Sequence, residues 1–516
     1  IRTFSTPRKP SKHNPATRVY PEDNPERWAK FLDYNKKDVD LEARIYHLLG
    51  DMPASEWELY ALDQEINDRG LPLDLEFIDA AREACLAHEC ELVNEATRIT
   101  GLDNPNSVAQ LLTWLNEQGV KCNNLRAETV RELLARDNLP VKVRSVLNIR
   151  AQLSLTSIKK FETMRAIAVN RTAKGCFRFY GAARTGRWSG QTIQPQNFKR
   201  GHKDDALIAR HKALFKSGMA DIAFADPLME ASNLLRAAIV GAPQLAIADL
   251  SSIENVVLNW VAGAEDKLAA FANGLDPYKL FAVQAYDVPY DAVTKQQRFE
   301  SKPPVLGCGY MLGGPGLVKY AKDLGVTLDK LKAATLVMTW REDNPEIVSF
   351  WKNIELAVFD ALDNPGRVIK VGPLLVRHKG EFLRIKLPSK RSLHYFRPSK
   401  KFAIVNHDGG TFEALNFHYW GVDTYTRKWC EISSHAGKIT ENVVQAMARD
   451  ILAHGMKLAL SKRVDVRGTV HDEVIAVARN AQKALRVLIE CMTTNPPWYT
   501  GPLKADGYIA YNYRKD

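Results

Sequence analysis

Residues 469–477, TVHDEVIAV, constrain the fold more than any other stretch of this 516-residue chain. Apolar residues stand on both sides of a polar tip made of His471, Asp472 and Glu473. Apolar arms around a short polar tip are typical of a β-hairpin. Two adjacent carboxylates repel each other, and they are accommodated easily only in water or against a cation. The stretch therefore predicts a hairpin, and it predicts a metal site only if another strand brings a further carboxylate to the tip.

Such a carboxylate stands at the end of an apolar run, residues 244–249, QLAIAD. The run predicts a buried strand that ends at Asp249, and the apolar spacing that follows predicts a helix. Ser251 and Glu254 match a capping box at the start of this helix. A carboxylate at the end of a core strand is held rigidly and can point at a metal ion. We therefore expect Asp249 and Asp472 to be partners, because hard cations prefer oxygen ligands.

The composition narrows the kinds of protein that the chain can be. Its length predicts two to four domains. A net charge of +11, with basic residues in local clusters, favours a polyanionic partner. The seven cysteines are scattered without a CxxC pair, which argues against a disulfide framework or a zinc site and fits a reducing compartment. The sequence has no apolar run of about 20 residues and no signal peptide, so we expect a cytoplasmic protein without a membrane span.

Residues 177–201 are rich in Gly, Arg, Gln and Asn. Arg187 offers a charge for phosphates, whereas Gln196 and Asn197 offer amides for base edges. This combination is what a nucleic-acid groove needs. The alternative is a polar surface loop.

Arg298, Lys302, Leu306 and Tyr310 recur at intervals of four residues. On a helix they would form one stripe, with two cations for phosphates and apolar and aromatic surface for a sugar and a base. This arrangement would suit a nucleoside triphosphate. Two consecutive prolines, 303 and 304, oppose a continuous helix because they lack the backbone N–H donor.

Periodic patterns predict most of the remaining elements. Helical spacing predicts helices over residues 28–49, 55–69, 73–99, 107–118, 127–136, 141–169, 327–363 and 441–460. Alternation predicts strands over residues 368–396 and a closing strand within residues 501–513. The basic and aromatic stretch at residues 390–401 is expected to form an exposed hairpin. Residues 1–27 are rich in proline and basic residues, so they are expected to form an extended tail.

Five of these stretches, taken in order, resemble the motifs of a family A DNA polymerase of the phage or bacterial type. Residues 249–263 resemble motif A, residues 298–310 motif B and residues 470–473 motif C. Residues 183–198 resemble the primer-template segment, and residues 441–453 resemble the helix that contacts the growing duplex. The resemblance implies a mixed α+β fold with a right-hand architecture: a helical thumb, an antiparallel-sheet palm and helical fingers.

The resemblance also implies an order of domains. A remnant of a 3′–5′ exonuclease domain would cover residues 1–50 and the thumb residues 51–172. The first part of the palm would cover residues 173–255, the fingers residues 256–400 and the second part of the palm residues 401–516.

The implied activity is that of a DNA-directed DNA polymerase, which extends a primer 3′-OH with dNTPs and releases pyrophosphate during DNA replication. Two Mg²⁺ ions, with Mn²⁺ as an alternative, would be held by Asp249, Asp472 and the backbone carbonyl of Leu250. One metal would lower the pKa of the primer 3′-OH, and the other would neutralise the triphosphate. Glu473 is expected to support these ligands, and its loss should be milder than that of Asp472. Primer-template DNA and dNTPs are the implied partners.

Other roles follow from the same motifs. Lys302 is expected to act in catalysis and to bind the triphosphate together with Arg298, with Tyr278 close to a phosphate. Glu254 would exclude a ribose 2′-OH, and Tyr310 would lie beside the templating position. Contacts with DNA are expected from Arg187, Gln196, Asn197, Gln445, His471, Lys159 and Lys160.

Several positions depart from the family pattern. Leu306 stands where Phe or Tyr is usual, so it would pack against the nucleotide sugar without an aromatic face. Met311 replaces a usual Gly. Val256 stands where Arg commonly follows the gate residue, so an ion pair is lost. Tyr278 replaces a His that often contacts phosphate, and its hydroxyl can still donate a hydrogen bond.

Residues 1–50 resemble the end of a 3′–5′ proofreading exonuclease domain. Tyr34 and Asp38 match its third motif, Tyr-x3-Asp, whereas the upstream carboxylate motifs are absent from this sequence. We predict that the chain alone has no proofreading activity. Metal-dependent 3′–5′ degradation that Asp38→Ala abolished would contradict this.

Three other functions share some of these features. A single-subunit RNA polymerase shares the paired carboxylates, but Glu254 as a gate argues against it. A two-metal nuclease also combines carboxylates with a basic groove, and the Arg298/Lys302 pair argues against it. A DNA-binding protein without catalysis is opposed by the intact Asp249 and Asp472.

Overall fold

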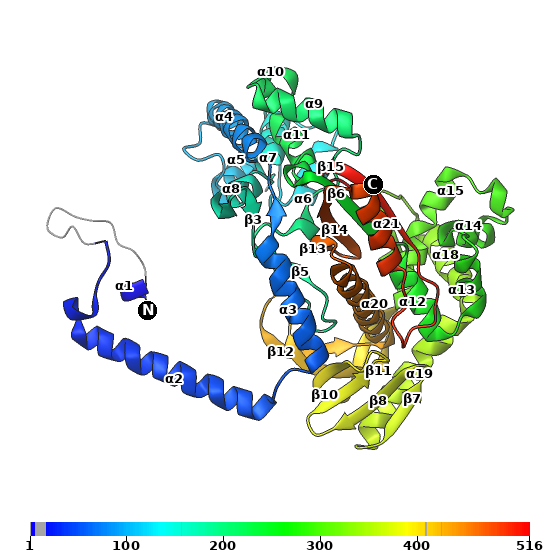
Figure 1. Cartoon of the computed structure of the whole chain (residues 1–516). Helices are drawn as coiled ribbons and strands as arrows, with labels where there is room; N and C mark the ends of the chain where they lie inside the picture. Colours follow the sequence, from blue (N-terminus) through cyan, green and yellow to red (C-terminus); the bar gives the residue numbers. More distant parts are fainter. Residues whose placement is uncertain (1, 6–16, 156, 408–409, 425, 516) are drawn as a thin grey trace. The chain divides into compact units, whose positions relative to one another are not determined.

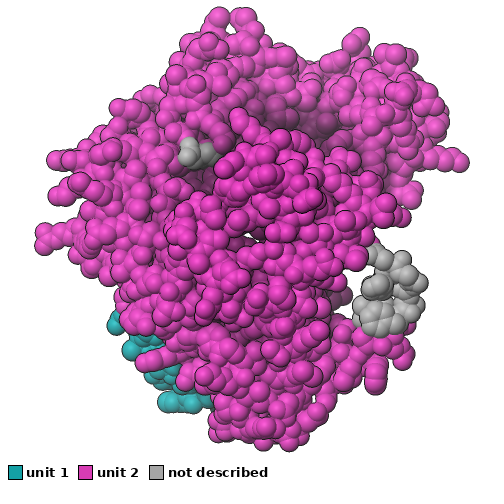
Figure 2. All heavy atoms as spheres, turned by 90° about the vertical axis from the view of Figure 1, so that its right-hand side faces the viewer, with its two compact units in different colours: residues 1–61 teal, residues 62–516 magenta. Residues whose placement is uncertain are grey.

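The structure is a computed structural model that describes residues 2–5, 17–155, 157–407, 410–424 and 426–515. The chain divides into two compact units, residues 1–61 and residues 62–516, which Figure 2 shows in different colours. Among the described residues, no helix is long and apolar enough to cross a membrane.

Helices make up the first unit as far as the structure describes it (Figure 1). They are α1 (Arg2–Ser5), the 3₁₀ helix η1 (Pro21–Asp23), α2 (Pro25–Leu49) and the first turns of α3 (Ala54–Arg69). The predicted helix over residues 28–49 is confirmed, and it begins where Asn24 accepts a hydrogen bond from the Arg27 backbone N–H at 3.1 Å. No residue of α2 is buried, and Leu48 is 84% exposed. Residues 6–16 of the predicted tail lie outside the described residues.

The second unit begins with a mostly helical region, residues 62–173. After the rest of α3 come α4 (Leu75–Thr100), α5 (Val108–Glu117), α6 (Ala127–Leu134), α7 (Val141–Leu153) and α8 (Ser157–Ile167), with the short strands β1 (Leu71–Pro72), β2 (Ala168–Val169) and β3 (Thr172–Ala173). The prediction of one helix over residues 141–169 is wrong. Two helices, α7 and α8, occupy this range instead. The helix α7 ends just before Ser154, whose Oγ donates to the Ala151 carbonyl at 2.7 Å, because such a side-chain bond competes with the helical backbone hydrogen bonds.

Short elements connect this region to the central sheet. They are β4 (Phe177–Arg178), β5 (Ser189–Gly190), η2 (Pro195–Asn197), α9 (Asp205–Lys216), α10 (Ala220–Ala223), α11 (Pro227–Asn233) and η3 (Arg236–Ala238). The predicted polar segment at residues 177–201 thus consists of short strands, a 3₁₀ turn and loops.

A four-stranded antiparallel sheet lies at the middle of the second unit, with the strand order β13-β14-β6-β15. Its strands are β6 (Val240–Leu250), β13 (Asp465–Val470), β14 (Glu473–Ala478) and β15 (Ala505–Asn512). The sequence predictions of a strand that ends near Asp249, of a hairpin at residues 469–477 and of a closing strand are confirmed. The register places Glu473 opposite Asp249 on one side and Asp506 opposite Asp249 on the other. Three acidic residues therefore meet at one end of the sheet.

Buried helices hold this sheet in place. The helix α21 (Ala481–Met492) packs against β6 and β15, and α20 (Ala436–Ser461) packs against α21 and α12 (Ile253–Ala262). Most residues of α20 are buried. The sheet end that carries Asp249 is therefore supported by packed elements.

Helices continue from α12 to residue 363. They are α13 (Glu265–Ala272), α14 (Pro277–Tyr286), η4 (Tyr290–Ala292), α15 (Lys295–Glu300), α16 (Lys302–Gly307), η5 (Cys308–Tyr310), α17 (Gly314–Asp323), α18 (Lys330–Asp343) and α19 (Pro345–Asp363). The four-residue stripe from Arg298 to Tyr310 is therefore spread over three short helical segments. The two prolines stand in the first turn of α16, where a missing N–H costs least.

A six-stranded antiparallel sheet follows, with the order β12-β11-β10-β9-β8-β7. Its strands are β7 (Val368–Val371), β8 (Leu374–Lys379), β9 (Phe382–Lys386), β10 (Ser392–His407), β11 (Gly410–Val422) and β12 (Trp429–Ser434). The strands predicted over residues 368–396 are confirmed, but the exposed hairpin predicted at residues 390–401 is wrong. Most of that stretch lies in one strand, whose Leu393 and Tyr395 are buried. The expected boundary between residues 400 and 401 falls inside β10, so it would divide a continuous strand.

Candidate active site

A cavity of about 850 Å³ opens at the end of the central sheet. Its walls come from the hairpin tip, the end of β6, the start of α12 and the segment before α9. Nine of the predicted site residues line it: Arg187, Gln196, Asp249, Leu250, Glu254, Tyr278, Leu306, His471 and Asp472. Residues that lie far apart in the sequence therefore converge on one space.

Asp249 and Asp472 meet at the edge of this cavity. The Leu250 backbone N–H donates to the Asp472 carbonyl at 3.2 Å, which ties the hairpin tip to the end of β6. Burial, and then the neighbouring Asp249 carboxylate, raise the pKa of Asp472 to about 7. Asp249 Oδ1 is buried and has no hydrogen-bond partner among the described residues. A buried carboxylate oxygen without a partner, beside a second carboxylate, fits a divalent cation.

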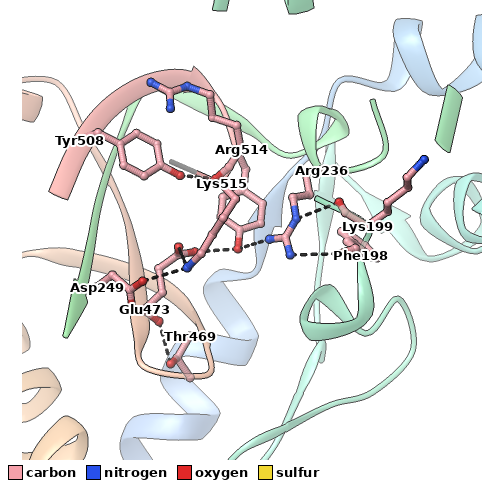
Figure 3. A network of polar contacts seen from close by, with 10 residues as sticks. Phe198, Lys199, Arg236, Asp249, Thr469, Glu473, Tyr508, Arg514 and Lys515 are labelled. Atoms are coloured by element: carbon pink, nitrogen blue, oxygen red, sulfur yellow. Dashed lines mark hydrogen bonds and ion pairs between the residues drawn. The ribbon is translucent and has the colours of Figure 1, made fainter. Parts of the chain in front are cut away.

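Glu473 lies in a different environment from the one that its position in the sequence predicts. The polar tip consists of His471 and Asp472 alone, and Glu473 is the first residue of β14 and only 1% exposed. Its carboxylate accepts from the Tyr513 hydroxyl at 2.6 Å and from Lys515 Nζ at 3.2 Å (Figure 3). Burial raises the pKa of Glu473, while Lys515 and Tyr513 oppose the shift. Glu473 is therefore a buried, bonded carboxylate that supports the sheet end from behind.

No sequence pattern predicts that Lys515 belongs to the site. Its Nζ donates to Asp249 Oδ2 at 2.8 Å as well as to Glu473, so one ammonium group bridges two carboxylates. No motif marks this lysine; only the closing strand β15, whose partner is β6, brings it to the site. Asp506, on β15 itself, also lines the cavity and accepts from Ser251 Oγ at 2.9 Å.

A buried arginine joins the carboxylates to the segment before α9. Arg236 Nη1 donates to the Tyr513 hydroxyl at 2.6 Å, and its other nitrogens donate to the carbonyls of Phe198 and Lys199 (Figure 3). The network therefore runs from this loop through Tyr513 to Glu473. It fixes the position of Phe198, which lines the cavity.

Glu254 does not cap α12. The helix begins after Ser252 without a side-chain cap, so the predicted capping box is wrong. Glu254 instead forms an ion pair with Arg187 at 2.8 Å and accepts from the Tyr310 hydroxyl at 3.0 Å. Burial, and then Glu254, raise the pKa of Tyr310. The charged partner of Glu254 is therefore Arg187, from a distant segment of the chain.

Positive charges gather beside Tyr278. The Arg298 guanidinium lies 5.2 Å and Lys302 Nζ 5.9 Å from the centre of its ring, and Arg298 is also paired with Asp276. Burial, and then the charges of Arg298 and Arg200, lower the pKa of Lys302. Cations held this close to one another favour a polyanionic ligand.

The amide side chains of the polar segment differ in position. Gln196 lines the cavity and donates to the Thr469 carbonyl at 3.2 Å, whereas its Oε1 is buried and has no partner in the described part of the chain. Asn197 is exposed and donates to Gln194.

Several predicted residues lie outside the cavity lining. Tyr310 and Glu473 contact lining residues, and Arg298 and Lys302 contact Tyr278, which lines it. The others, Asn197, Gln445, Lys159 and Lys160, lie on η2, α20 and α8. Gln445 donates to Glu441 at 3.1 Å, and Lys159 is exposed.

The site combines carboxylates and a neighbouring backbone carbonyl, which suit hard cations, with cations and amides, which suit phosphates and bases. Such an arrangement can bind a nucleoside triphosphate or a nucleic-acid backbone beside a divalent metal ion. Both phosphoryl transfer and hydrolysis can use these groups.

Comparison with known proteins identifies the family. No family model matches the chain. The whole chain is 34% identical, over 528 residues, to a DNA polymerase of Bacillus phage SP02, of which it covers 80%. A solved structure of the POL domain of Pol1 from M. smegmatis, in complex with a DNA primer-template and dNTP, shares the fold, with a TM-score of 0.57 and 17% identity over 87% of this chain and 68% of that one. The expected mixed α+β polymerase fold is therefore confirmed, and the chain belongs to the family of the Bacillus phage SP02 DNA polymerase.

Proposed function

We propose that the chain is a template-directed DNA polymerase that extends a primer 3′-OH with dNTPs and releases pyrophosphate. The observation that carries the proposal is the convergence of Asp249 and Asp472 on one cavity, beside the cations near Tyr278. Its membership of the DNA polymerases supports the same conclusion.

Divalent metal ions would be held by Asp249, Asp472 and the backbone carbonyl of Leu250, and we assign two Mg²⁺ ions, with Mn²⁺ as an alternative. When bound, they would favour deprotonation of the primer 3′-OH and neutralise charge on the phosphates. Asp249 and Asp472 would orient both ions from a rigid sheet end. Glu473 would hold Lys515 and Tyr513 in place behind these ligands.

The incoming nucleotide would lie across the cavity from the sheet. Arg298 and Lys302 would bind its triphosphate, and Lys302 would donate a hydrogen bond or proton to the leaving pyrophosphate. Tyr278 would present its hydroxyl to a phosphate, and Leu306 would pack against the sugar. Glu254 would exclude a 2′-OH by occupying that space. In this arrangement the 3′-oxygen of the primer bonds to the α-phosphorus as the bond to the β-phosphate oxygen breaks.

Glu254 is held for this role by two partners, Arg187 and Tyr310. Because both contacts fix the carboxylate, the gate would be rigid before a nucleotide arrives. Tyr310 would also lie beside the templating position.

Primer-template DNA would be bound around the same cavity and beyond it. Basic side chains would contact phosphates and amides would contact base edges in the minor groove. The residues assigned to this surface are Arg187, Gln196, Asn197, Gln445, His471, Lys159 and Lys160. We place the protein in the cytoplasm of a bacterial cell or of a phage-infected host.

Primer extension tests the proposal. A primed template with Mg²⁺ should be extended with dNTPs and poorly with rNTPs, and Asp472→Ala should abolish extension without unfolding the chain. Efficient use of rNTPs would favour an RNA polymerase, and degradation of the template without extension would favour a nuclease. Extension that survived Asp472→Ala would contradict the site assignment.

A further inference from the structure

We propose that His202, His211 and Glu230 form a second metal site, which binds one divalent transition-metal ion, with Zn²⁺ the preferred ion. The ligand atoms of these three residues all lie within 4.8 Å of one another. Among the described residues, this is the one group of three or more His, Cys, Asp or Glu side chains with such spacing. The site shares no ligand with the carboxylates of the central sheet.

Three separate segments bring the ligands together. His202 precedes α9, His211 lies within α9 and Glu230 lies on α11. The ring nitrogens His202 Nε2 and His211 Nδ1 each lie 2.7 Å from the same oxygen, Glu230 Oε1. Convergence on a single oxygen from two directions places the three ligand atoms around one point.

The spacing is close to that of a metal shell. Zn²⁺ binds nitrogen and oxygen at about 2.0–2.1 Å, so neighbouring ligands of a tetrahedral ion lie about 3.3 Å apart. The carboxylate oxygen would therefore have to move away from each imidazole by roughly 0.6 Å, which a side-chain rotation can supply. Three protein ligands leave one position for water.

The surroundings support a fixed site. The side chains of His202, His211 and Glu230 are only 23%, 13% and 11% exposed. Asn233 Nδ2 donates to the second carboxylate oxygen of Glu230 at 3.3 Å, which is the kind of outer contact that orients a metal-binding carboxylate. The Phe224 ring lies 4.9 Å from the His211 ring and shields it.

The donor set separates this site from the sheet end. Imidazole nitrogen favours Zn²⁺ and similar ions over Mg²⁺, whereas the all-oxygen set around Asp249 favours Mg²⁺. A metal at the new site would also join His202 to two helices. Phe198 and Arg200, which line the cavity, lie just before His202. The ion would therefore restrain the loop that carries them.

Calorimetric titration of the full chain with Zn²⁺, after removal of metals with a chelator, tests the proposal. Three variants are compared: Glu230→Gln, His211→Ala and, as the matched control, His88→Ala. His88 is also a partly buried histidine beside a glutamate, Glu91 at 3.5 Å, but the described residues place no third ligand beside this pair. The double variant Asp249→Asn/Asp472→Asn removes the oxygen ligands of the sheet end.

We expect one Zn²⁺ to bind the wild type, the His88→Ala control and the double variant with the same affinity, and millimolar Mg²⁺ not to compete. Glu230→Gln and His211→Ala should each weaken this binding at least tenfold, while circular dichroism shows that they remain folded. Co²⁺ bound in place of Zn²⁺ should give a visible absorption that both variants lose. Equal affinity in Glu230→Gln and the wild type, or loss of binding in the double variant instead, would overturn the proposal. Because Glu230→Gln preserves size and a hydrogen-bond acceptor, it gives the test if His211→Ala does not fold.

Discussion

The carboxylates at the end of the central sheet and the Glu230 carboxylate beside α9 occupy opposite electrostatic environments. At the sheet end, burial and the nearby Asp249 raise the pKa of Asp472 to about 7. At the other site burial also acts to raise the pKa of Glu230, but hydrogen bonds from His211 and His202 outweigh it, so the pKa is lowered. Asp472 therefore faces a like charge, whereas Glu230 faces two hydrogen-bond donors.

The difference shows how a functional carboxylate can be recognised. Glu230 is satisfied by its neighbours, so it contributes to stability whether or not a metal is present. At the sheet end, Lys515 pairs with Asp249 and Glu473, while Asp249 Oδ1 has no partner among the described residues. Like charges held together in this way destabilise the fold unless a cation binds, and such an arrangement is characteristic of functional sites.

Removing a proposed metal ligand should give the largest effect. We expect Asp249→Asn to reduce primer extension by about 10³-fold or more, because the metal-binding charge is lost. Glu473→Gln should cost roughly tenfold, because Glu473 acts through Lys515 and Tyr513. Single-turnover extension on one primed template measures both. Equal losses of primer extension in Asp249→Asn and Glu473→Gln would contradict the distinction between a metal ligand and a supporting residue.

The opposite pKa shifts predict opposite effects on stability. The raised pKa of Asp472 means that its charge destabilises the folded chain: the penalty is absent below about pH 4, grows as the pH rises towards 7 and is complete above it. Asp472→Asn should therefore stabilise the metal-free chain at pH 8 by roughly 1–2 kcal/mol, and have little effect near pH 4.

The lowered pKa of Glu230 has the reverse sign. Its contribution is present above its ordinary pKa of 4.5 and is lost as the pH falls through the folded value. Glu230→Gln should therefore destabilise the metal-free chain at pH 8. Urea unfolding of Asp472→Asn and Glu230→Gln at pH 4 and pH 8 measures both effects on stability. A destabilised Asp472→Asn at pH 8 would show that the carboxylates at the sheet end do not repel each other.

Tyr310→Phe tests whether Glu254 needs both of its partners. The variant removes the hydrogen bond to Glu254 Oε2 and leaves the ion pair with Arg187. We expect ribonucleotide incorporation relative to dNTP incorporation to rise about fivefold, since one lost hydrogen bond costs about 1 kcal/mol. Competition between labelled rNTPs and dNTPs measures the ratio. Unchanged selectivity would show that Arg187 alone positions the gate.

Lys515→Met should give the smallest effect. Lys515 Nζ competes with a metal ion for Asp249 Oδ2, and its removal makes the site more negative. The Mg²⁺ concentration for half-maximal extension should fall about threefold. A higher requirement for Mg²⁺ would instead show that Lys515 organises the carboxylates for the metal.

The sequence predicts the framework of the site well. Apolar alternation and a polar tip are local signals, and they place Asp249 near the end of β6 and Asp472 at the tip of the hairpin whose strand β14 pairs with β6. The helices over residues 28–49 and 327–363 also follow from local spacing, although the second pattern is divided between α18 and α19 at Asn344.

Features that depend on distant contacts could not be predicted. Glu473 looks like part of the tip because strand register is not visible in the sequence, and Lys515 carries no motif. Glu254 matches a capping box as a string, but its partners Arg187 and Tyr310 lie 67 and 56 residues away in the chain. The cysteine spacing argues against cysteine-ligated zinc, but it says nothing about a site built from His202, His211 and Glu230.

Direct binding of Mg²⁺ tests the central claim, that Asp249 and Asp472 together hold a metal ion. Calorimetric titration of Mg²⁺ into the chain with primer-template DNA should show binding that Asp249→Asn and Asp472→Asn each weaken at least tenfold. His211→Ala should leave it unchanged, because imidazole does not contribute to a Mg²⁺ site. Mg²⁺ binding to Asp472→Asn with wild-type affinity would contradict the account.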